Sequence, residues 1–82
     1  MTVEVLLFGP EAAATGRERV SLELASSAPT PADLRAALGE RFPKLIPTLP
    51  AARFAVNGEF AHESTCIRPG DEVALIGMVS GG

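Results

Sequence analysis

The chain has 82 residues, enough for one small domain, and 46% of them are hydrophobic, which excludes an intrinsically disordered segment. Its formal net charge of −3 disfavours a nucleic-acid-binding protein, because such a protein needs a cationic surface for the phosphates. Its one cysteine, Cys66, excludes an internal disulfide, and the N-terminal segment resembles neither a signal peptide nor a membrane span. We therefore expect a small cytoplasmic domain with no nucleic acid and no membrane as partner.

The first predicted element is a strand over residues 2–9, TVEVLLFG, which is rich in β-branched and apolar residues and ends at a Gly-Pro pair. A strand with two apolar faces lies in the middle of a layered fold or contacts a partner. Strand alternation places the following residues on its two faces: Val3, Val5 and Leu7 on one, and Leu6 and Phe8 on the other.

The second predicted strand covers residues 19–25, RVSLELA, where apolar and polar residues alternate regularly. This pattern is typical of a half-exposed strand. We expect it to run antiparallel to the first strand, across an Ala- and Gly-containing loop at residues 10–18.

The clearest local signal is that of a helix within TPADLRAALGERFP, residues 30–43. Thr30 caps the helix, Pro31 fits its first turn, and Asp33 completes a capping-box pattern. Pro43 ends the helix, because a proline disfavours helical geometry at the residue before it. The apolar residues that recur at helical spacing are Leu34, Ala37, Leu38 and Phe42.

The second half of the chain predicts a proline-rich connection followed by three strands. Residues 43–52 hold three prolines and are expected to form an apolar loop without regular structure. Residues 53–58, RFAVNG, predict a strand that enters an Asn-Gly hairpin turn, with a short return strand over residues 60–62. Residues 68–77, RPGDEVALIG, begin with a Pro-Gly-Asp turn and continue as a final strand that is apolar on both faces. This order predicts an α+β fold in which one amphipathic helix packs across a single mixed sheet.

The outward faces of the first and last strands form a candidate docking surface. With Leu75 inward, Ile76 and Met78 lie outward beside Leu6 and Phe8 if the two strands are neighbours. Val79 continues the same segment. Because the predicted helix already covers the other face, we expect these residues to bind a larger partner. A self-dimer through the same surface and scattered apolar exposure are the alternatives.

The side chains offer little catalytic chemistry. His62 and Cys66 could act as a nucleophile pair only with a third group and a cleft, so an incidental loop histidine and a semi-buried cysteine are the expected roles. No metal site is expected, because Glu63 together with these two residues lacks a fourth ligand and zinc-site spacing. Asp71 and Glu72 form an exposed acidic pair that is either solvated or meets a basic partner.

The remaining reactive group is the carboxylate of MVSGG, residues 78–82. We expect residues 1–77 to form the folded domain and residues 78–82 a flexible tail, which spans about 16 Å when extended. Gly81 and Gly82 carry no side chain, so they can pass through a narrow channel in a partner. Adenylation by an enzyme with ATP would allow sulfur to replace the carboxylate oxygen. The product is a thiocarboxylate, a tethered sulfur nucleophile, which makes the protein a carrier and not an enzyme by itself.

The chain resembles the ubiquitin-like sulfur carriers, most closely the molybdopterin synthase small subunits. The resemblance spans nearly the whole chain and rests on VEVLLFG, PTPADLRAAL, AVNG and, most specifically, GDEVALIGMVSGG. It implies a ubiquitin-like β-grasp fold, with a mixed sheet of about five strands and one main helix packed on one face. It further implies that the first and last strands are parallel at the sheet centre.

The resemblance also implies a reaction cycle. An E1-like adenylyltransferase activates the Gly82 carboxylate with ATP, and a sulfurtransferase or cysteine desulfurase supplies sulfur for the thiocarboxylate. The tail then enters the active site of the large subunit of molybdopterin synthase, with Gly81 passing through a narrow channel. The two kinds of subunit form a heterotetramer, in which the tail donates sulfur to cyclic pyranopterin monophosphate. The carrier itself binds no cofactor, since ATP is used by the activating enzyme.

Two departures from the resemblance bear on the recipient. The family often has two prolines where this chain has Gly77 and Met78, and aromatic residues at Leu75 and Ile76, which implies a less stiff tail and a re-packed partner surface. Thiamine, cysteine or tRNA thiolation, and attachment to protein lysines, stay open as alternatives, although the helix and the proline-rich segment disfavour a thiamine carrier. A plain interaction module with an inert diglycine is the third interpretation.

Overall fold

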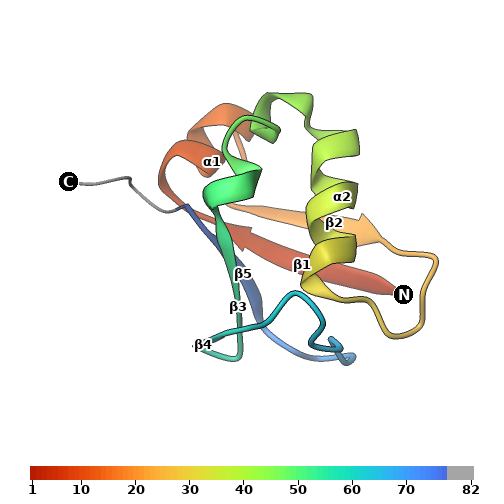
Figure 1. Cartoon of the computed structure of the whole chain (residues 1–82). Coiled ribbons are helices and arrows are strands. Elements are labelled where there is room, and N and C mark those ends of the chain that lie inside the picture. Colours follow the sequence, from red (N-terminus) through yellow and green to blue (C-terminus); the bar gives the residue numbers. More distant parts are fainter. Residues whose placement is uncertain (78–82) are drawn as a thin grey trace.

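The structure, a computed structural model, describes residues 1–77, and the expected tail at residues 78–82 lies outside the described part of the chain. Within residues 1–77, five strands form one mixed sheet, and the helices pack on one of its faces (Figure 1). This arrangement confirms the predicted α+β class. The elements are β1 (Thr2–Leu7), α1 (Gly9–Thr15), β2 (Arg19–Glu23), α2 (Pro31–Arg41), the 3₁₀ helices η1 (Pro43–Leu45) and η2 (Leu49–Ala51), β3 (Arg53–Val56), β4 (Glu59–Phe60) and β5 (Val73–Ile76).

The strand order of the sheet is β2-β1-β5-β3-β4. β1 and β5 are parallel, with Leu6 opposite Ala74, and every other neighbouring pair is antiparallel. The first and last strands therefore lie side by side in the interior of the sheet, as the resemblance implied. One apolar face of these two strands packs against the helices, and the other apolar face points away from them.

The core lies between the sheet and the helices. Thr30 and Asp33 form the predicted capping box, in which the Thr30 N–H donates to Asp33 Oδ2 at 2.9 Å and the Asp33 N–H donates to Thr30 Oγ1 at 3.3 Å. The cap fixes the start of α2, so that its apolar residues face the sheet. The buried residues include those predicted to face inward: Val3, Val5, Leu7, Val20, Leu22, Leu34, Leu38, Val73 and Leu75.

The prediction of a loop over residues 10–18 is wrong, because most of these residues form helix α1. Pro10 lies in the first turn, three alanines follow Glu11, and Gly16 ends the helix with a φ of 69°. Three features of this segment are typical of a helix: a proline in the first turn, an acidic residue near the N-terminus, and a left-handed glycine after the last helical residue. The helix has only seven residues, so its propensity alone is weak and packing stabilises it.

The proline-rich segment at residues 43–52 is also more regular than predicted. It forms η1 and η2, which bring Leu45 and Leu49 into the core. Three strand boundaries differ as well: β1 ends at Leu7 instead of Gly9, β2 ends at Glu23, and β4 covers Glu59–Phe60 instead of residues 60–62. None of the helices in residues 1–77 is long and apolar enough to cross a membrane.

Candidate functional site

The sheet face opposite the helices carries an apolar surface that we call the docking face. Leu6 and Ile76 are half-buried there, whereas Phe8 is 52% exposed. These three residues line one open groove with a volume of about 340 Å³, so strand alternation placed them together correctly. The parallel pairing of β1 with β5 is what brings them side by side.

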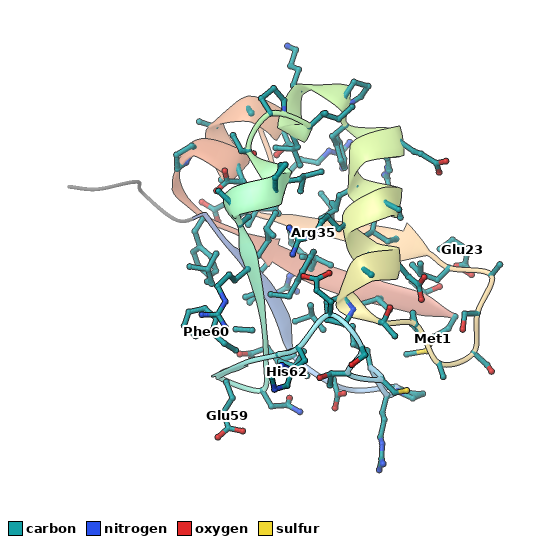
Figure 2. All side chains as sticks on the ribbon, in the orientation of Figure 1. Met1, Glu23, Arg35, Glu59, Phe60 and His62 are labelled. Atoms are coloured by element: carbon teal, nitrogen blue, oxygen red, sulfur yellow. The ribbon has the colours of Figure 1, made fainter. Side chains whose placement is uncertain are left out.

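The docking face also contains residues that the sequence analysis missed. Phe60 on β4 lies opposite Ala55 on β3 and is 52% exposed, and both residues line the same groove, as does Ala74. Figure 2 shows Phe60 at the β4 side of the sheet, away from α2. The Arg53 guanidinium lies 4.3 Å from the centre of the Phe60 ring, a cation–π distance. The Asn-Gly turn could have indicated from the sequence that Phe60 belongs to this surface, because the register of the hairpin places Phe60 beside Ala55.

The chain leaves the sheet next to this groove. β1 and β5 are parallel and end at the same edge, so Gly77 follows β5 where α1 follows β1. Gly77 is the last residue that the structure describes. The predicted site residues Met78, Val79, Gly81 and Gly82 lie outside the described residues.

The side chains considered for catalysis lie elsewhere. His62 is exposed on the connection between β4 and β5 (Figure 2). Cys66, on the same connection, is also exposed, so the expectation of a semi-buried cysteine is wrong. Among residues 1–77, no group of three or more His, Cys, Asp and Glu side chains is placed to hold a metal ion.

Asp71 of the predicted acidic pair has a structural role. Its carboxylate accepts hydrogen bonds from the Arg68 N–H at 2.9 Å and from Asn57 Nδ2 at 3.0 Å, and these two bonds lower its pKa from 3.8. Asn57 Oδ1 in turn accepts from the Glu72 N–H at 2.9 Å. The network joins the β3–β4 turn to the start of β5, and so helps to align the strands of the docking face.

We expect Asp71→Asn to destabilise the protein at neutral pH and to have little effect in acid. Because folding lowers the pKa of Asp71, its contribution is present above the unfolded value near 3.8 and is lost as the pH falls through the folded value. Urea unfolding of both proteins, measured from neutral to strongly acidic pH, tests this. A difference in unfolding free energy that stays constant over this range would contradict it.

Comparisons with known proteins give the family and the fold of this chain. The chain matches the model of the ThiS family over residues 5–82. The crystal structure of SAMP1 from Haloferax volcanii is 27% identical with a TM-score of 0.80, and each chain is covered to 100%. A chain of the complex of subunits 1 and 2 of molybdopterin-converting factor from Helicobacter pylori is 29% identical with a TM-score of 0.68, again with 100% of each chain covered.

A more distant structure shares the fold alone. The solution structure of SAMP1 from Methanosarcina acetivorans is 20% identical, with a TM-score of 0.80 over 99% of this chain and 96% of that one. No curated protein matches the chain. The fold is thus the ubiquitin-like β-grasp that the sequence resemblance implied. Since the family model covers all but the first four residues, this chain belongs to the ThiS family.

Proposed function

We propose that this protein is a sulfur carrier, in which the Gly82 carboxylate is adenylated and then converted to a thiocarboxylate. The observation that carries the proposal is the position of the docking face on a β-grasp domain. Its groove lies beside the point where the chain leaves β5 toward the Gly-Gly sequence. A partner seated on this groove would receive the C-terminus directly.

The proposed recipient system is molybdopterin synthase, with this chain as its small subunit. The similarity to a chain of the Helicobacter pylori complex supports a large-subunit partner. The apolar groove with two half-exposed phenylalanines is suited to such a contact, because aromatic residues in the core of an interface contribute much of its binding energy. The tail would then donate sulfur to cyclic pyranopterin monophosphate inside a heterotetramer.

The proposed activating partners are an E1-like adenylyltransferase and a sulfurtransferase or cysteine desulfurase, all in the cytoplasm. ATP is used by the activating enzyme, and the carrier holds no cofactor of its own. A second candidate function is protein modification through the same C-terminus. The similarity to a small archaeal modifier protein of Haloferax volcanii, at 25% identity, supports it.

Sulfur loading of the wild-type protein and of Cys66→Ser tests the carrier chemistry. We expect both proteins to gain sulfur with the activating enzyme, ATP and a sulfur donor, because Cys66 lies on a loop and is not the proposed reactive group. Mass spectrometry of the digested protein locates the sulfur, which should be on the C-terminal peptide. Sulfur on the peptide that contains Cys66, and its loss in Cys66→Ser, would contradict the proposal.

Incubation of the loaded carrier with candidate acceptors then separates the two functions. Sulfur transfer to cyclic pyranopterin monophosphate in the presence of the large subunit supports the synthase. Conjugates of the carrier to protein lysines support the modifier. Cys66→Ser serves as a matched background in both assays, since the substitution removes the competing thiol.

A further inference from the structure

A buried carboxyl group lies where the folded domain ends. Glu11, the third residue of α1, is only 2% exposed and is the one buried charged residue among residues 1–77. Its Oε1 atom is buried and accepts no hydrogen bond from any of these residues. A buried carboxyl oxygen that has no hydrogen-bond partner within residues 1–77 lowers the stability of this part of the chain.

The helix N-terminus does not account for this burial. An acidic residue in the first turn is favoured by the partial positive charge of the helix N-terminus. An exposed carboxylate at the same position would gain this interaction and would also keep its hydration. The burial of Glu11 therefore reflects what its side chain contacts.

Glu11 contacts Gly77, the residue that directly follows β5. A Cβ atom at Gly77 would overlap Glu11 Oε1 and lie 2.9 Å from its Cδ and 3.0 Å from its Oε2. Gly77 does not have a positive φ, so its backbone conformation does not require glycine. The requirement at position 77 is space, and the carboxyl group of Glu11 fills that space.

Any side chain at position 77 would carry a Cβ, and that atom would displace the Glu11 carboxyl group. With glycine at this position, a buried side chain from α1 packs against the backbone at the end of β5. The two residues are 66 positions apart in sequence and are brought together because β1 and β5 end at one edge.

We infer that Glu11 is a positioning residue for the C-terminal segment: its buried carboxyl group, packed against Gly77, sets the direction in which the chain leaves β5. The inference rests on the proposed function, in which the terminus must reach a partner's active site. A small displacement of a reacting group has a large effect on rate. A change of direction at Gly77 is therefore expected to slow sulfur transfer without weakening the docking of the domain.

A double-mutant cycle with Glu11→Ala and Gly77→Ala tests this inference. We expect each single variant to lower the single-turnover rate of sulfur transfer by about tenfold. Glu11→Ala removes the carboxyl group that packs against Gly77, and the methyl group of Gly77→Ala displaces it. The double variant should recover much of that rate, since the new methyl group occupies part of the vacated space. Glu11→Gln keeps the shape of the side chain and should stay within about threefold of the wild-type rate.

Binding and structural measurements separate positioning from a general loss of structure. The Kd for the large subunit, measured by calorimetry, should change much less than the transfer rate in all variants, because neither Glu11 nor Gly77 lines the groove of the docking face. Thermal melts confirm folding, and Glu11→Leu replaces Glu11→Ala if the smaller side chain does not fold. Additive effects of the two substitutions on rate, or an unchanged rate in both single variants, would overturn the inference.

An activity-independent readout keeps this test apart from that of the proposed function. Amide ¹⁵N relaxation and residual dipolar couplings of residues 77–82 in the free protein report on the direction and order of the segment. We expect both to change in Glu11→Ala and to return toward wild type in Glu11→Gln. If wild-type protein forms no thiocarboxylate, the proposed function fails, whereas unchanged couplings in Glu11→Ala would refute the role of Glu11 alone.

Discussion

We expect deletion of Gly82, or addition of residues after it, to abolish sulfur loading while the domain stays folded. The proposed reaction takes place on the carboxylate of Gly82 itself. An extension converts this carboxylate to an amide, and a deletion moves the terminal carboxylate one residue back along the chain, so in both variants the carboxylate is missing from the position where it reacts. The core and all five strands lie within residues 1–77, and the change therefore leaves their packing intact. Pyrophosphate exchange and mass spectrometry measure loading, and circular dichroism measures the fold.

A cleavable extension supplies the matched control for this experiment. A protein extended after Gly82 by a protease site should be inactive until the protease restores the free glycine carboxylate. Recovery of loading after cleavage shows that the extension blocked the chemistry and did not damage the protein. Full loading of the uncleaved, extended protein would refute the carrier function.

We expect Ile76→Asp to weaken binding to the large synthase subunit by about 2 kcal/mol or more, which corresponds to at least about thirtyfold in Kd. Ile76 lines the groove of the docking face beside Phe8, so a partner that fills this groove would have to desolvate the new carboxylate. Phe8→Ala and Phe60→Ala should weaken binding in the same direction, because each removes an exposed aromatic ring from the groove. Calorimetric titration measures all three effects.

Ile46→Asp is the matched control for the docking face. Ile46 is 54% exposed and follows η1, outside the groove, so the same substitution there should leave Kd nearly unchanged. Thermal melts show whether Ile76→Asp, in a central strand, keeps its fold. If Ile46→Asp weakens binding as much as Ile76→Asp does, the docking face is wrongly assigned.

Several features of this protein follow from the sequence because their causes are local. The capping box of Thr30 and Asp33 and the proline at position 43 mark the ends of α2 without help from the rest of the chain. Alternation in β1 and β5 assigns their faces, since a strand has a period of two residues wherever it lies. The groove residues Leu6, Phe8 and Ile76 could be predicted in this way.

Other features depend on contacts that no local pattern encodes. The seven-residue helix α1 and the 3₁₀ helices η1 and η2 are too short to be stable by propensity, and packing against the core selects them.

The burial of Glu11 beside Gly77 depends on the parallel pairing of strands from opposite ends of the chain. From the sequence, Glu11 is expected in a loop, and Gly77 is expected only to make the tail less stiff. Only the tertiary structure decides that one fills the space left by the other, because a side chain's surroundings are set by distant residues once the sheet has formed.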